Sequence, residues 1–183
     1  MKRMILIAVG LLVVPANASA QTDAQTIERA LAAAPARARD GASVVKWNAD
    51  FTWASVKEGT NQMVCYDRSG EARRAAFDVQ CTSLANLDRV AQNRRFEAEG
   101  ADRQAVSALI EAAEEAGTRV AAEFGSVWIA MRGENQAGAG THTTIAVPGA
   151  TTASTGLPEN GRGGGAWIMG AGTAGAHIMI PGS

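Results

Sequence analysis

The chain has 183 residues, and its 17 Lys and Arg nearly balance 18 Asp and Glu, for a formal net charge of −1. It has no basic stripe in which Arg alternates with aromatic residues, so a nucleic-acid partner is not expected. After the first twenty residues, no apolar stretch reaches the roughly 20 residues that a membrane-spanning helix needs. We therefore expect no membrane anchor in the rest of the chain, whose length suits one domain with its own core.

Residues 1–20 have the pattern of an export signal. A positively charged start precedes an apolar run over residues 5–14, and Ala18 and Ala20 place small residues where a signal peptidase reads them. The apolar run makes a helix of about 15 Å, half the roughly 30 Å hydrocarbon core of a membrane. We therefore expect a cleaved signal peptide and an exported domain, periplasmic or extracellular, that spans residues 21–183.

Cys65 and Cys81 are the only two cysteines. An even pair in an exported protein predicts a disulfide bond. Closing a loop of about 15 residues would stabilise the fold by roughly 3 kcal/mol in the chain-entropy estimate. A two-cysteine metal site is the alternative, and it is disfavoured because neither histidine is near these cysteines in the sequence.

The first part of the mature chain predicts a helix followed by strands. Residues 22–34 are rich in Ala, and Thr22 or Asp23 is a suitable N-cap for a helix there. Residues 43–47 and 62–66 are rich in β-branched and aromatic side chains, which predicts two strands. We expect these strands to form a small antiparallel sheet.

The middle of the chain predicts two helices. The first begins after Ser83 and carries apolar residues at helical spacing as far as Ala91. The second is capped by Asp102 and ends at Gly117. We expect both helices to pack on one face of the sheet, and the disulfide to link this helical part to the strands that precede it.

The last third is rich in glycine, with twelve glycines between residues 133 and 175. Short apolar segments within it predict four strands, over residues 127–131, 144–147, 167–169 and 178–180. Long Gly-rich loops are expected within residues 132–166, whereas the apolar final segment is expected to dock on the fold. The predicted architecture is therefore α+β: one domain with a small antiparallel sheet, two or three helices and a Gly-rich C-terminal set of short strands.

Several segments carry a resemblance when they are taken together. They are Ile27-Glu28-Arg29-Ala30-Leu31, Gly41-Ala42-Ser43-Val44, Glu58-Gly59-Thr60-Asn61 leading to Cys65, Cys81 at the head of a helix, and Ala176-His177-Ile178-Met179-Ile180-Pro181. With them the chain resembles a group of small exported bacterial proteins that has no assigned activity. Members more often carry Gly-Pro-His where this chain has Gly175-Ala176-His177. The resemblance covers most of the mature chain and implies export, a disulfide and a single domain, but no catalytic residue.

His142 and His177 are the only histidines, and both adjoin predicted strands of the last third. If those strands pair, the two imidazoles would face one another and could bind a transition metal. A third ligand would have to come from Glu134, Glu159 or Asp67. Structural histidines at strand edges are the alternative and the favoured interpretation, so no metal or cofactor is predicted.

Serine chemistry has one candidate. The chain has no Gly-x-Ser-x-Gly elbow, and Ser126 is the serine at the start of a predicted strand near the histidines. A triad with His177 and an acid such as Asp78 is unconstrained by sequence spacing, because triads assemble in space. The glycines of residues 170–175 match the spacing of a dinucleotide fingerprint, but no helix can follow them, so a hairpin loop is expected.

No catalytic constellation is complete, while a disulfide and long loops provide a stable scaffold for a binding surface. The sequence therefore favours a non-enzymatic exported binding or interaction domain of the bacterial envelope, whose partner would be an envelope protein or a small-molecule ligand. The alternative is a hydrolase or metal-dependent enzyme that uses His142 or His177. The four tryptophans are expected to fill the core, with sugar stacking as their alternative role.

Overall fold

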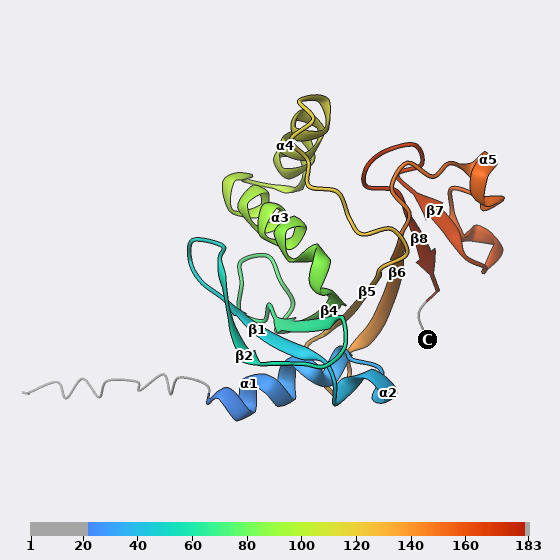
Figure 1. Cartoon of the computed structure of the whole chain (residues 1–183). Helices are drawn as coiled ribbons and strands as arrows, with labels where there is room; N and C mark the ends of the chain where they lie inside the picture. Colours follow the sequence, from blue (N-terminus) through green and yellow to red (C-terminus); the bar gives the residue numbers. More distant parts are fainter. Residues whose placement is uncertain (1–21, 182–183) are drawn as a thin grey trace, which may run out of the picture.

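The structure is a computed structural model that describes residues 22–181, so the predicted signal peptide over residues 1–20 lies outside the described part. One eight-stranded sheet has the order β2-β1-β3-β4-β5-β6-β8-β7. Helices lie on both of its faces, with α1 and α2 on one and α3 on the other (Figure 1). The α+β class is confirmed. The sheet is larger than predicted, because the C-terminal strands join it.

The strands are β1 (Ser43–Trp47), β2 (Trp53–Lys57), β3 (Met63–Asp67), β4 (Phe77–Ser83), β5 (Val127–Gly133), β6 (Gly140–Ala146), β7 (Trp167–Met169) and β8 (His177–Ile180). The helices are α1 (Asp23–Ala30), α2 (Ala36–Arg39), α3 (Leu87–Glu99), α4 (Arg103–Glu115) and α5 (Thr152–Thr155), with short 3₁₀ turns η1 (Leu31–Ala33), η2 (Leu84–Asn86) and η3 (Gly161–Gly163).

The sheet is mixed, whereas an antiparallel sheet was expected. β1 pairs antiparallel with β2 and parallel with β3, where Val44 lies beside Cys65. The reason is strand β2, which the sequence analysis missed: because β2 reverses the chain after β1, the next strand runs in the direction of β1 again. All other neighbouring strands pair antiparallel.

The N-terminal helix covers the middle of one sheet face. Thr22 caps α1, and its side chain and that of Gln25 form a capping box, as the sequence predicted for a cap at this end. The buried residues of this layer come from α1, η1 and strands β1, β3, β4 and β5. They include Ala30, Leu31, Ala33, Val44, Cys65, Val79, Cys81 and Ile129.

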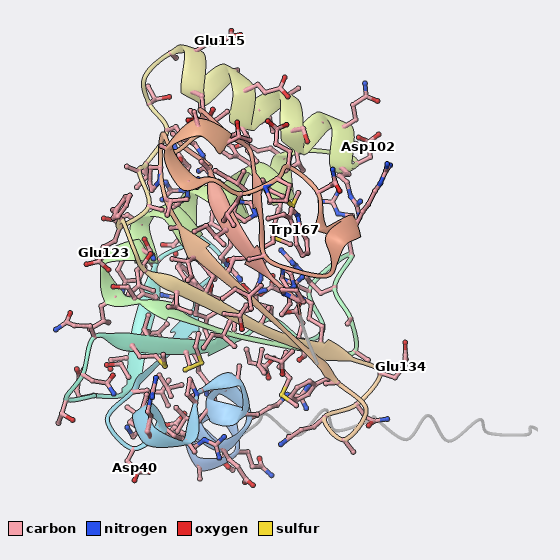
Figure 2. All side chains as sticks on the ribbon, turned by 90° about the vertical axis from the view of Figure 1, so that its right-hand side faces the viewer. Asp40, Asp102, Glu115, Glu123, Glu134 and Trp167 are labelled. Atoms are coloured by element: carbon pink, nitrogen blue, oxygen red, sulfur yellow. A yellow bond between two sulfur atoms is a disulfide. The ribbon has the colours of Figure 1, made fainter. Side chains whose placement is uncertain are left out.

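The predicted disulfide is present in this layer, where Figure 2 shows it between the strands and the N-terminal helices. Cys65 of β3 lies directly opposite Cys81 of β4, and both residues are fully buried. The bond therefore joins two neighbouring strands. The expectation that it would tie a helix to the sheet was wrong, because Cys81 belongs to strand β4 and the helix begins only after that strand.

The opposite face is covered by α3 over β1 and β3, with Trp128 of β5 packed beside them. Leu87 and Val90 of α3 pack with Val64 and Tyr66 of the sheet. Helix α4, whose N-cap Asp102 accepts a bond from the Ala105 amide as predicted, contacts α3 and lies beyond it (Figure 1). Only one of the two helices therefore packs on the sheet directly, which leaves the C-terminal strands uncovered on this face.

Successive side chains of the C-terminal strands point to opposite faces of the sheet. Ile145, Ile178 and Ile168 lie side by side on β6, β8 and β7 and pack into a third core cluster around Val147 and Ala176. The docked final segment and the β7–β8 hairpin over the glycines of residues 170–175 are both confirmed. Within residues 22–181 no helix has the length and apolar character required to cross a membrane.

Removing the disulfide tests its share of the stability. We expect the Cys65→Ala, Cys81→Ala double variant to lose about 3 kcal/mol of unfolding free energy in urea, because the open chain regains loop entropy. Reduced wild-type protein is the matched control and should unfold at a similarly lowered urea concentration. An unchanged midpoint in both would show that the bond does not stabilise the fold.

Candidate functional site

The uncovered half of the sheet forms the floor of a groove. Trp128 of β5 lies opposite Thr144 of β6, and Thr144 lies opposite Met179 of β8. These side chains lie on the same sheet face as α3, beside the part that α3 covers, and Trp128 packs against the cluster that includes Leu87 and Val90 of α3. Figure 2 looks onto the C-terminal strands, with Trp167 of β7 in front and α4 behind and above.

Two adjoining cavities of about 320 and 350 Å³ lie over this floor. They share Asn93, Trp128, Thr144 and His177 among their lining residues, so we describe them together as the groove. Volumes of this size are typical of sites for small organic molecules. The groove has two chemically different ends, one lined by paired charges and the other by two arginines without a carboxylate partner.

At the first end, each arginine is paired with a carboxylate. Arg68 is 5% exposed and lies 2.7 Å from Glu71 and 2.5 Å from Glu97, while Arg74 lies 2.6 Å from Glu97. Burial opposes the charge on Arg68, but the two carboxylates outweigh it and raise its pKa. Burial likewise opposes the charge on Glu97, and the two arginines outweigh it and lower its pKa.

Asp78 extends this paired set into the sheet. It is fully buried on β4, and its Oδ2 lies 3.2 Å from Arg132 Nε and 3.7 Å from Arg74 Nη1. Its Oδ1 accepts a hydrogen bond of 2.9 Å from Gln80. A buried carboxylate held in this way is a structural counter-ion for the arginines around it.

The histidines lie on the same face as the floor. His142 on β6 is opposite Ala130 of β5 and lines the charged end of the groove. Burial lowers the pKa of His142, and the positive charges of Arg132 and His177 lower it further. His142 is therefore neutral at pH 7.

His177 on β8 lies between the two ends. Its Nδ1 is 2.8 Å from the Gly175 carbonyl, and because a carbonyl only accepts, Nδ1 carries the proton of this bond. In neutral His177, Nε2 is then the acceptor. The ring is thus fixed by the backbone of the loop that precedes β8, within the groove wall.

At the second end, Arg89 of α3 and Arg119 of the loop after α4 line the cavity. Arg119 donates 2.5 Å bonds to Gln92 and Asn93, and Arg89 donates to the Val120 carbonyl. These bonds hold the loop along α3 and place both guanidinium groups at the groove. They are all bonds to neutral groups.

Neither arginine has an ion pair with any carboxylate among the residues that the structure describes. Burial lowers the pKa of Arg89, which Glu114 offsets only in part. Burial and the charge of Arg89 lower the pKa of Arg119 to about 10. The second end therefore holds two positive charges that, among residues 22–181, Glu114 offsets only in part.

The structure brings His142 and His177 to one cavity but places Ser126 elsewhere. Ser126 donates to the Glu123 carbonyl at 2.6 Å and accepts from Asn86 at 2.9 Å, and Ala146 lies between it and His177. Asp78, the candidate acid of the triad, pairs instead with Arg74 and Arg132.

No third ligand joins the two histidines: Glu134, Glu159 and Asp67 do not line their cavity. Asp67 instead lies 2.6 Å from Arg29. Among residues 22–181 no three His, Cys, Asp or Glu side chains come together as a metal site.

Arg89 and Arg119 were missed by the sequence analysis. Arg89 is one of several arginines on a polar helix, and Arg119 belongs to a loop without a recognisable motif. The nearest signal is that Arg89 falls one position before Val90, on the buried side of α3. Nothing in the sequence indicates that the loop would bring Arg119 next to it.

The fold and the groove define an α+β protein built on one sheet, half of whose second face is open and bears a cavity of ligand size. No protein-family model, curated protein or solved structure matches the chain.

Replacing Arg68 by Met tests the paired end. We expect Arg68→Met to lower the unfolding free energy by about 3 kcal/mol, because two partly buried carboxylates lose their main partner. Arg37→Met, at an exposed position of α2, is the matched control and should stay near wild type. Equal stability of the two variants in urea denaturation would contradict the assignment.

Acid should destabilise the protein through His142. Its pKa in the folded protein lies below the roughly 6.5 of an unfolded histidine, so the unfolded chain binds more protons as the pH falls through that value. We expect the melting temperature of the wild type to fall between pH 7.5 and 5.5 more steeply than that of His142→Gln. Parallel curves for the two proteins would show that His142 does not titrate as described.

Proposed function

We propose that the chain is an exported, non-enzymatic binding domain of the bacterial envelope, and that its ligand is a small molecule held in the groove. The observation that carries this proposal is the pair of adjoining cavities over the open half of the sheet, which share Trp128 and Thr144 as their floor. An aromatic floor with a few polar groups around it is the usual composition of a small-molecule site.

Export is supported by two independent features. The predicted signal over residues 1–20 directs the chain out of the cytosol, and the buried Cys65–Cys81 bond is typical of proteins that mature in an oxidising compartment. The resemblance to small exported bacterial proteins agrees with both.

The scaffold is suited to binding. The groove floor belongs to sheet strands, and its walls are tied to α3 by the hydrogen bonds of the loop after α4. Rigid elements keep a site preorganised, which reduces the entropy lost when a ligand binds. Ser126, the candidate nucleophile of the sequence analysis, does not line either cavity.

A second candidate function rests on the histidines. His142 and His177 line one cavity, which is compatible with a hydrolase or a metal-dependent enzyme. A metal would have to be held by two protein ligands, since the described residues supply no third one. Calorimetric heat with zinc, copper or nickel that disappears in the His142→Gln, His177→Gln double variant would favour this candidate.

Blocking the groove tests the proposed function. Thr144→Trp places a large side chain on the floor, and Thr141→Trp places the same side chain on the other face of β6 as its control. In a thermal-shift screen of neutral, cationic and anionic organic molecules, we expect stabilising compounds for the wild type and Thr141→Trp that have no effect on Thr144→Trp. Stabilisation that survives in Thr144→Trp, or no stabilising compound at all, would contradict a ligand site in the groove.

A further inference from the structure

We propose that Arg89 and Arg119 form the seat for the carboxylate of a small organic acid whose apolar body lies in the groove. The inference deepens the proposed function, since it rests on the groove being a ligand site and assigns the chemical class of the ligand. It follows from four observations: the burial of Arg89, the free donors of both arginines, the local charge balance and the apolar lining beside them.

Arg89 is a buried charge without a counter-ion. Arg89 is 7% exposed, and its guanidinium donates one hydrogen bond among the described residues, to the Val120 carbonyl. It has no ion pair within residues 22–181. Such a group costs stability unless another charge compensates it. The remaining donors of its guanidinium are available for an anion.

Space is open in front of these donors. Gly175 lies at the groove wall, and a side-chain carbon added there would come 3.6 Å from Arg89 Nη2 and 3.7 Å from Glu114 Oε1. Arg119 lines the same cavity, and its Nη1 and Nη2, which donate to Gln92 and Asn93, each carry a second N–H. Two guanidinium groups can therefore direct unused N–H donors to one small anion.

The local charge balance indicates how much negative charge the ligand carries. Glu114 lines the same cavity and acts electrostatically on both arginines without forming an ion pair to either. Two positive charges and one negative charge leave a formal charge of +1. A single carboxylate neutralises it, whereas a phosphate dianion would exceed it and be repelled by Glu114.

The lining beside the arginines is apolar. Ile110, Ala122 and Ala176 stand around the cavity, and Trp128 forms its floor. This surface favours a hydrophobic or aromatic body. The first end of the groove competes less for the carboxylate, because each of its arginines already lies within ion-pair distance of Glu71, Glu97 or Asp78.

Isothermal titration calorimetry with defined probes tests the seat. Phenylacetate carries the proposed carboxylate and body, phenylacetamide is its uncharged isostere, and phenyl phosphate carries a dianionic head. For the wild type we expect phenylacetate to bind about tenfold to a hundredfold more tightly than phenylacetamide, the range for hydrogen bonds to a charged group. Phenyl phosphate is expected to bind more weakly than phenylacetate.

Three variants locate the effect. Arg89→Met is expected to abolish the preference for phenylacetate, and Arg95→Met, which removes one charge from an exposed position of the same helix, is expected to keep it. Gly175→Val closes the space before Arg89 with both arginines intact and should weaken phenylacetate binding about tenfold or more. Circular dichroism and melting temperature verify the fold of each variant, and Gly175→Val answers the question if Arg89→Met does not fold.

The outcomes distinguish two claims: that the groove binds a ligand, and that Arg89 and Arg119 hold its carboxylate. Equal binding of phenylacetate and phenylacetamide, both lost in Thr144→Trp, would overturn the carboxylate seat and leave the groove as a binding site. A preference that persists in both Arg89→Met and Gly175→Val, or tighter binding of phenyl phosphate, would overturn the seat as well. If neither probe binds the wild type, the carboxylate seat is rejected. The thermal-shift screen then tests separately whether the groove is a ligand site.

Discussion

The width of the sheet is the constraint on which the rest of the structure depends. Eight strands spaced about 4.8 Å apart span roughly 34 Å, whereas one helix with its side chains is about 10–12 Å wide. Of the described helices, α3 packs against the second face of the sheet, over β1 and β3 and beside Trp128 of β5, and α4 lies on α3 instead. A single helix cannot cover the remaining strands. The open face of β5, β6 and β8, with Trp128 and Thr144 on it, is the consequence, and the groove is built there.

The electrostatics of the groove follow from how its arginines are paired. Arg68 is slightly more deeply buried than Arg89, yet two carboxylates lie within ion-pair distance of Arg68 and none lies within that distance of Arg89 among the described residues. Burial lowers the pKa of both guanidinium groups, but Glu71 and Glu97 outweigh it at Arg68, whose pKa rises, while the pKa of Arg89 falls. A paired buried charge is part of the scaffold, whereas an unpaired one has a cost that a bound anion would offset. Natural proteins accept such local costs where binding requires them.

Local sequence patterns were sufficient for much of the fold but not for the site. The helix caps, the Cys65–Cys81 bond and the strands rich in β-branched residues have local causes, and the structure confirms them. Strand β4 was missed because Asp78 and its polar neighbours look solvent-exposed until the arginines that pair with them are known. The site depends on long-range packing: Arg119 reaches Arg89 only because the loop after α4 returns along α3. No spacing rule in the sequence encodes that return.

The open half-face provides the cavity, and two arginines that have no ion pair among the described residues line one end of it. The most direct measurement is the NMR signal of the arginine Nε–H groups during a titration with phenylacetate. The account predicts that the signals of Arg89 and Arg119 shift together and saturate, while that of Arg68 stays in place because its carboxylates already occupy it. Shifts confined to Arg68 and its neighbours, or no saturable shift at any arginine, would contradict the account.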